Sequence, residues 1–345
     1  NGNYMWIQYF NSYLNEKGSA GFVMASSATD AGNSEKLIRE KLIATKTVDV
    51  IVSVGNNFFY TRSLPCHLWF FDKGKPAENK DKILMIDARN TYRVVSSTIN
   101  DFSDGQLLNL TTIVQLYRGN TEAISQAEQA HKQALKEQFE IVNGYYVVLA
   151  KELKQLSVDL KNEDIIIPEK IELSNIDNPQ EAKEIFKSFE KPASKVSELI
   201  TSLEKEIVKI TEQVEREEID KKTATAKMKP FKDQLNKLNK PLKAYQTGVA
   251  EFLKELKQRI SDWKKLLEYF PENQYVDVEG LCKIVDLEEI EENDYSLTPG
   301  RYVGYSINID EDFDYKKRIS EINSSLNKLS NDANNLMGQI QSIVI

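Results

Sequence analysis

The sequence predicts an α/β fold over its first third, followed by a long and mostly helical region. Up to about residue 120, short apolar or β-branched runs alternate with an amphipathic helical pattern. After about residue 121, apolar residues recur over long stretches at alternating steps of three and four, which is typical of helices that pack side by side. The expected divisions of the chain are 1–120, 121–275, 276–310 and 311–345.

The chain opens with a helical pattern that is rich in aromatic residues. Gly18 suits the C-terminal end of this helix, because glycine accepts the left-handed conformation that often ends one. The apolar positions at helical spacing are Met5, Trp6, Tyr9, Phe10, Tyr13 and Leu14.

The next three segments predict a strand, a helix and a strand. "GFVMA" (21–25) is a short apolar run, "NSEKLIREKLIA" (33–44) is amphipathic, and "VDVIVSV" (48–54) is β-branched. This is the pattern of a βαβ unit, so we expect two parallel, buried strands.

A loop with three consecutive aromatic residues, Phe58 to Tyr60, follows the second of these strands. The connection from Val54 to the next apolar run, His67 to Phe71, has about a dozen residues, includes Pro65 and lacks a helical period, so we expect an antiparallel pair joined by a long loop. "KILMIDAR" (82–89) predicts a further strand. The aromatic loop would then leave the carboxyl end of a parallel strand, where open α/β sheets hold their ligands.

The second half of the chain predicts long packed helices. Apolar positions between 196 and 214 and between 228 and 256 form two heptad seams, which we expect to pack as a hairpin across the polar link at 220–226. Pro241 should kink the second helix or split it in two. The stretch from Asn162 to Lys191 is expected to be an extended linker.

The last helical pattern is the most regular and needs a facing helix, either from this chain or from another subunit. Its apolar positions are Ile319, Ile322, Leu326, Leu329, Ala333, Leu336, Ile340 and Ile343.

Charge and cysteine content exclude several classes of protein. Residues 1–120 carry 13 Lys and Arg against 11 Asp and Glu, whereas residues 121–345 have a net charge of −10, so the first third is the better candidate for contact with nucleic acid. Cys66 and Cys282 have no partner motif, which argues against a disulfide framework or a metal site and favours the cytoplasm. No apolar run approaches the roughly 18 to 20 residues of a membrane span.

Two separate stretches carry a family resemblance. "VEGLCKIVDLEEIEENDYSLTPGRYVGY" (278–305), followed by an acidic link and a heptad helix, closely resembles the C-terminal signature of the modification subunit of type I restriction-modification systems. "GFVMA", "EKLIREKLI" and "NNFFYTRSLPCHLWFFDKGK" resemble the second half of that subunit's adenine-N6 methyltransferase domain. The resemblance implies the second half of a class I (Rossmann-like) methyltransferase sheet, followed by a long helical, coiled-coil C-terminal region.

The resemblance also implies partners and a cofactor. The intact subunit would transfer a methyl group from S-adenosylmethionine to adenine N6 of double-stranded DNA, alongside a second modification subunit, a specificity subunit and a restriction subunit. The specificity subunit would choose the target sequence and would meet the C-terminal helix through Ile319, Ile322, Leu326, Leu329, Leu336 and Ile340.

The family's cofactor turn and its Asn-Pro-Pro-Phe tetrapeptide are not found in the 345 residues. We therefore expect no catalytic residue, no S-adenosylmethionine site and no activity on this chain alone. Since the chain begins Asn-Gly-Asn, we expect it to be a piece of a longer protein.

The resemblance assigns Phe59 as the ring on which the flipped adenine stacks, with Phe58 as the alternative one register away. Tyr60 and Arg62 are the expected DNA contacts, Arg62 through a phosphate. The competing interpretations are a ring that plugs the end of the sheet and a solvated loop charge. His67 and His131 are given no role.

Arg301 and Tyr302, in "TPGRYVGY", are expected to dock the C-terminal region on the catalytic domain, through an ion pair and a filled pocket. A plain turn at Pro299 and Gly300 that leads to a packed strand is compatible with that role.

Two other functions remain open. A non-catalytic interaction scaffold would use a methyltransferase remnant and the coiled coil. A single-chain restriction enzyme would need its own target-recognition domain, for which the chain leaves no room.

Overall fold

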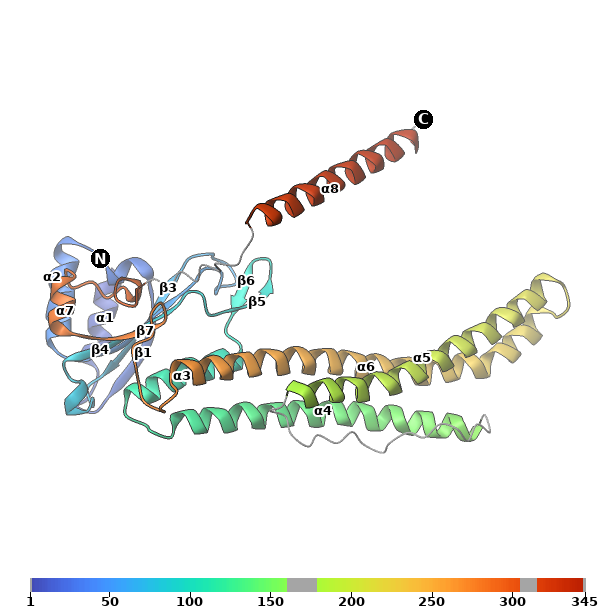
Figure 1. The fold of residues 1–345 in the computed structure, drawn as a ribbon, viewed down its shortest axis with the longest axis horizontal. Coiled ribbons are helices and arrows are strands. Elements are labelled where there is room, and N and C mark those ends of the chain that lie inside the picture. Colours follow the sequence, from blue (N-terminus) through green and yellow to red (C-terminus); the bar gives the residue numbers. More distant parts are fainter. Residues whose placement is uncertain (1, 160–178, 305–314, 344–345) are drawn as a thin grey trace. The chain divides into compact units, whose positions relative to one another are not determined.

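A mixed five-stranded sheet and a bundle of long helices make up most of the molecule (Figure 1). The computed structural model describes residues 2–159, 179–304 and 315–343. The elements are α1 (Gly2–Ser12), β1 (Ser19–Ala25), η1 (Ser26–Thr29), α2 (Asn33–Ala44), β2 (Val48–Val54), β3 (Cys66–Asp72), η2 (Ala77–Asn79), β4 (Lys82–Ala88), β5 (Arg93–Ser96), β6 (Ile99–Asp101), α3 (Asp104–Tyr117), α4 (Ala123–Asp159), α5 (Pro179–Glu215), α6 (Lys221–Tyr269), β7 (Cys282–Asp286), α7 (Leu287–Glu292), η3 (Pro299–Arg301) and α8 (Tyr315–Ile343).

The main sheet has the strand order β1-β3-β2-β4-β7. β2 and β4 are parallel, while β3 runs antiparallel to both β1 and β2, and β7 runs antiparallel to β4. The antiparallel β2–β3 pair, which the short connection predicted, is confirmed, and so is the strand predicted over "KILMIDAR". β5 and β6 form a separate two-stranded hairpin.

The expectation of two buried, parallel neighbours in the first βαβ unit is correct only in part. β1 and β2 point the same way, but β3 lies between them and pairs with both. β2 is buried along its whole length, whereas β1 is an edge strand with most of its residues exposed or half-buried. The prediction erred because β3, which follows β2 in the chain, inserts between β1 and β2.

The first helix is shorter than predicted and packs on a different face. It ends at Ser12, and Gly18 lies in the turn that precedes β1. Tyr4 and Ile7 are its buried residues. Five of the apolar positions that predicted the helix, Met5, Trp6, Tyr9, Phe10 and Tyr13, are exposed to between 38% and 84%.

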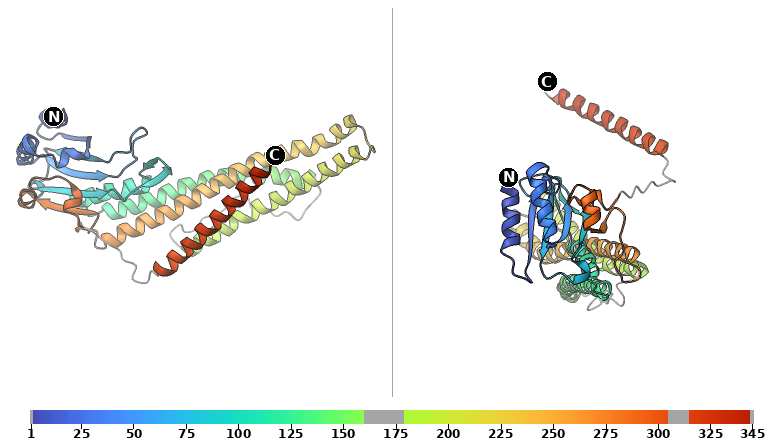
Figure 2. Two further views of the ribbon diagram at one scale, coloured as in Figure 1. Left: turned by 90° about the horizontal axis from the view of Figure 1, so that it is seen from above. Right: turned by 90° about the vertical axis from the view of Figure 1, so that its left-hand side faces the viewer.

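Helices cover both faces of the main sheet (Figures 1 and 2). On one face, α1, α2 and α7 pack over a core that includes Ile51, Trp69 and Phe71. On the other face, Val52 and Leu84 pack against α3 and against residues near the ends of α4 and α6. The sheet is therefore the middle of three layers, which explains why β2 and β4 are almost entirely apolar and buried.

The long helices share their own core. Leu203 of α5 packs with Leu238 and Leu242 of α6, so the predicted hairpin is confirmed, although its turn lies at residues 216–220. Asp220 caps α6 by accepting hydrogen bonds from the backbone N–H groups of Lys222 and Thr223. α4 joins the same core through Phe139 and Tyr146, a third helix that the seams did not predict.

Two predictions about this region are corrected. α6 runs as one helix from Lys221 to Tyr269 with Pro230 and Pro241 inside it, so Pro241 does not split the helix in two, and the alternative, a kink at Pro241, stays a prediction. Residues 179–191, expected to belong to an extended linker, are the start of α5. The rest of that linker, 162–178, lies outside the described residues.

The chain divides by its contacts into one unit that ends at Gly304 and a second that begins at Tyr305. The segment expected to dock, residues 276–310, contributes β7 and α7 to the first unit up to residue 304. The second unit contains α8. No helix among residues 2–159, 179–304 and 315–343 is long and apolar enough to cross a membrane.

Candidate functional site

The aromatic loop is built by close packing at the carboxyl end of β2. Gly55 follows this strand, and a Cβ atom at this position would lie 2.8 Å from the backbone oxygen of Arg89, which follows β4. Only glycine therefore allows the two strand ends to approach this closely. Asn57 then adopts a φ of 67°, a left-handed conformation that asparagine tolerates better than most residues.

The β5–β6 hairpin holds the first part of this loop. The backbone N–H of Asn100 donates to the oxygen of Asn57 over 2.8 Å, and its side-chain amide donates to the oxygen of Asn56 over 3.1 Å. The ring of Phe58 packs against Phe102, with centroids 4.7 Å apart. Phe58 is therefore half-buried and committed to contacts within the protein.

The second part of the loop projects outward. Phe59 and Arg62 form an isolated antiparallel bridge, with Tyr60 in the turn between them. Phe59 is 40% exposed and Tyr60 is 90% exposed. Arg62 is also exposed and makes no ion pair with any described residue. Phe59, Tyr60 and Arg62 thus share one short turn, whereas Phe58 faces the hairpin.

His67 is a packed and hydrogen-bonded core residue. Its Nδ1 lies 3.0 Å from the hydroxyl of Thr29, which in turn lies 2.9 Å from the hydroxyl of Thr298. Burial, with a further contribution from the positive charge of Arg89, lowers the pKa of His67 to about 4. A neutral His67 therefore ties β3 to η1 and to the segment before η3.

The "TPGRYVGY" stretch packs at the same edge of the sheet. Arg301 forms an ion pair with Asp30 over 2.7 Å, and the buried Tyr302 donates its hydroxyl to the oxygen of Ser296. The backbone N–H of Leu297 donates to the oxygen of Thr29. These contacts hold the segment against the turn that follows β1. It contains the 3-10 turn η3 and leads to no strand among the described residues.

The described residues contain no cluster of His, Cys, Asp and Glu that could hold a metal ion. Cys66 and Cys282 are unpaired and buried, and burial raises the pKa of both thiols. His131 is also buried, where its Nε2 lies 3.1 Å from the side-chain oxygen of Asn109.

The apolar seam of α8 faces solvent within its own unit. Its exposed members are Ile319, Ile322, Leu326, Leu329 and Leu336, each between 46% and 65% exposed. The side chain of Ile340 lies outside the described residues.

Asn100 and Phe102 support the aromatic loop, and neither was predicted from the sequence. Asn100 acts through its place on the β5–β6 hairpin, which has no strong strand pattern of its own. The only sequence signal for this support was the aromatic side chain of Phe102, which follows β6.

Replacing Asn100 with alanine is expected to loosen the aromatic loop, because one side-chain hydrogen bond worth about 1 kcal/mol is lost. Limited chymotrypsin digestion should then cleave after Phe58, Phe59 or Tyr60 about five times faster than in the unaltered chain. Asn90→Ala is the matched control, because Asn90 is exposed and follows β4, the strand that pairs with β2. Equal cleavage in the two variants would contradict this role of Asn100.

A family model described as N-6 DNA Methylase matches residues 1–155 and 246–311, well over half of the chain. The chain is also 31% identical over 203 residues to the type I restriction enzyme MjaIX methylase subunit of Methanocaldococcus jannaschii, a match that covers 59% of this chain and 35% of that subunit. The type I restriction enzyme MpnII methylase subunit of Mycoplasma pneumoniae is 24% identical over 153 residues, which cover 44% of this chain and 27% of that subunit. The chain therefore spans about a third of these relatives or less.

Two solved structures are also similar to parts of the chain. The type I restriction-modification methyltransferase subunit of Streptococcus thermophilus is 18% identical, with a TM-score of 0.32, over 34% of this chain and 24% of that one. The EcoKI M protein is 19% identical, with a TM-score of 0.28, over 33% of this chain and 24% of that one.

Proposed function

Because this chain belongs to the N-6 DNA methylase family, we propose that it is part of the modification subunit of a type I restriction-modification system. The resemblance predicted from "GFVMA", the aromatic loop and the "TPGRYVGY" stretch is confirmed at the level of this family. The complete subunit would methylate adenine N6 in double-stranded DNA, with S-adenosylmethionine as the methyl donor, in the cytoplasm.

The observation that carries this proposal is the exposed turn from Phe59 to Arg62 at the carboxyl end of β2. An enzyme that modifies a base inside a duplex must rotate that base outward and stack it against an apolar or aromatic side chain. Phe59 offers a partly exposed ring on a loop that Gly55 and Asn100 hold in place. Tyr60 and Arg62, in the same exposed turn, would contact the sugar-phosphate backbone of the DNA beside the rotated base.

We propose that the five-stranded sheet is the second half of a class I methyltransferase sheet. β1 supports this assignment, because it is an edge strand that pairs with β3 on one side and with no other described strand. A further strand of the same sheet could pair there. The cofactor turn and the catalytic amide would then lie in the other half, so this chain would supply the base-stacking side of the site.

Assembly would use the exposed seam of α8. An apolar stripe on a helix that is otherwise polar is stabilised by a facing helix. We propose that the helical spacers of a specificity subunit fill this role. A second modification subunit and a restriction subunit would complete the enzyme.

Titration calorimetry with S-adenosylmethionine tests the division of the site. This chain alone is expected to show no binding and no methylation, whereas the complete subunit should do both. Micromolar binding by this chain alone would contradict the proposed division. A complete subunit that binds neither the cofactor nor DNA would favour the interaction scaffold instead.

A further inference from the structure

The first half of α6 is strongly basic, although the region around it is acidic. Residues 221–243 contain eight lysines and no arginine, and Asp233 is their only acidic residue. The net charge of −10 over residues 121–345 conceals this segment, because the acidic residues lie elsewhere, many of them on α5. A charge averaged over a whole region is therefore a poor guide to this part of the surface.

All eight lysines are exposed, and none forms an ion pair with a residue that the structure describes. The acidic residues at the turn before α6 form no ion pair with them. Asp220 in particular is engaged in capping the helix, where it accepts hydrogen bonds from Lys222 and Thr223. The segment thus presents eight exposed lysines, none of them paired with an acidic side chain that the structure describes.

Five of the lysines form a stripe along the outer side of α6. Lys222, Lys229 and Lys240 are separated by seven and eleven residues, and Lys232 and Lys243 by eleven. Seven residues are about two helical turns and eleven about three, so Lys222, Lys229 and Lys240 form one row and Lys232 and Lys243 a second row, about 60° further around the helix. The buried residues Ala224, Leu238 and Leu242 point inward, toward the core shared with α4 and α5.

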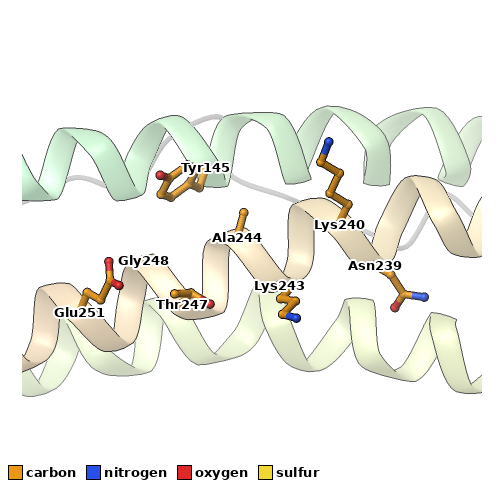
Figure 3. A pocket seen from close by; sticks show the side chains of 8 residues that line it. All are labelled: Tyr145, Asn239, Lys240, Lys243, Ala244, Thr247, Gly248 and Glu251. Carbon is orange, nitrogen blue, oxygen red and sulfur yellow. The ribbon is translucent and has the colours of Figure 1, made fainter. Parts of the chain in front are cut away.

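The stripe ends beside an open groove between α4 and α6 (Figure 3). Lys240 points toward α4 in this view and Lys243 points away from it. Asn239 and Thr247 also line the groove and add polar groups that can donate hydrogen bonds, while Glu251 adds one carboxylate at the end away from Lys240. Tyr145 closes one side of the groove, where it packs so tightly on Gly248 that a Cβ atom there would lie 2.8 Å from its ring.

Residues 221–243 lie outside both segments that match the N-6 DNA Methylase family model. The two matched segments end at residue 155, within α4, and resume at residue 246, within α6. The lysine stripe therefore belongs to an addition to the methylase fold rather than to the fold itself.

We propose that the stripe Lys222, Lys229, Lys232, Lys240 and Lys243 binds the phosphate backbone of duplex DNA without regard to sequence. Its two ends, Lys222 and Lys243, lie 21 residues apart along the helix, or about 32 Å, which is close to one turn of B-DNA. None of the large apolar side chains exposed in the described residues lies in this segment. A protein partner would normally need such a side chain at the centre of its interface.

The choice of DNA over another polyanion rests on the proposed function. The stripe would add affinity for DNA away from the aromatic loop, and so hold the duplex while the target base is rotated outward. Because the contact is with phosphates, its contribution should fall steeply as the salt concentration rises.

The test measures binding of the 345-residue chain to a fluorescent 30-base-pair duplex of random sequence, by anisotropy, between 50 and 200 mM NaCl. One variant changes the five stripe lysines to glutamine. The control variant makes the same change at five exposed lysines elsewhere, so that both lose equal charge: Lys41, Lys80, Lys151, Lys195 and Lys205. Circular dichroism checks that both variants stay helical, since lysine and glutamine have similar helix propensities.

The slope of log K against log salt is expected to decrease in magnitude by about 4.5 in the stripe variant, at about 0.9 for each of five phosphate contacts, and by less than 1 in the control. Equal slopes in the two variants would overturn the proposal. Poly-L-glutamate that competes as well as duplex DNA for the unaltered chain would also overturn it, in favour of an acidic protein partner. Neither result depends on methylation, so the proposed function can stand even if the lysine stripe proves not to bind DNA.

Discussion

Replacing Phe59 with leucine in the complete subunit is expected to lower the rate of adenine methylation in duplex DNA by about 5- to 150-fold. Leucine keeps an apolar side chain of similar size but has no ring face, and stacking of a base on an aromatic ring is worth about 1 to 3 kcal/mol. Cofactor binding should not change, because the ring serves only the rotated base. Methylation of the substrate in single-turnover conditions measures the loss directly.

Phe58→Leu is the matched control for this experiment. The Phe58 ring packs on Phe102 rather than facing outward, so leucine in its place should retain most of that packing and most of the activity. Phe59→Trp should also retain much of the activity, because tryptophan restores an aromatic face. If instead Phe58→Leu loses activity while Phe59→Leu keeps it, the stacking ring is Phe58.

Replacing Leu326 and Leu329 with glutamate is expected to abolish co-purification of the subunit with its specificity subunit. Both side chains are exposed within their own unit, at 58% and 65%, and both lie on the apolar seam of α8. Burying an apolar side chain of this size is worth about 1.5 to 3 kcal/mol, and a buried unpaired glutamate adds a larger cost. Tandem-affinity purification of the complex measures the effect.

The matched control changes Ser324 and Asn331, which lie between seam positions of the same helix, to glutamate. This double variant adds the same charge but should still assemble. Circular dichroism should show that both double variants of the chain keep their helical content. A lower melting temperature of the isolated chain, with assembly unaffected, would mean that the apolar seam of α8 packs on this chain rather than on a partner.

The sequence by itself determined the features that depend on neighbouring residues. A β-branched run located β2, the short segment "KILMIDAR" located β4, and the steps of three and four located α6 and α8. The short connection between Val54 and His67, which has no helical pattern, determined the antiparallel β2–β3 pair. These are local rules of periodicity and chain length, so they can be read without knowing what the segment packs against.

Only the tertiary structure decided which of two adjacent aromatic rings is available. Phe58 and Phe59 are identical side chains in one loop, and Phe102, from 44 residues later in the sequence, covers the first and leaves the second exposed. The place of β3 between β1 and β2 and the third helix of the bundle were likewise decided by partners distant in sequence. The physical reason is the same in each case: burial is a property of the whole packed structure, so a local pattern shows which residues can be buried but not which neighbour buries them.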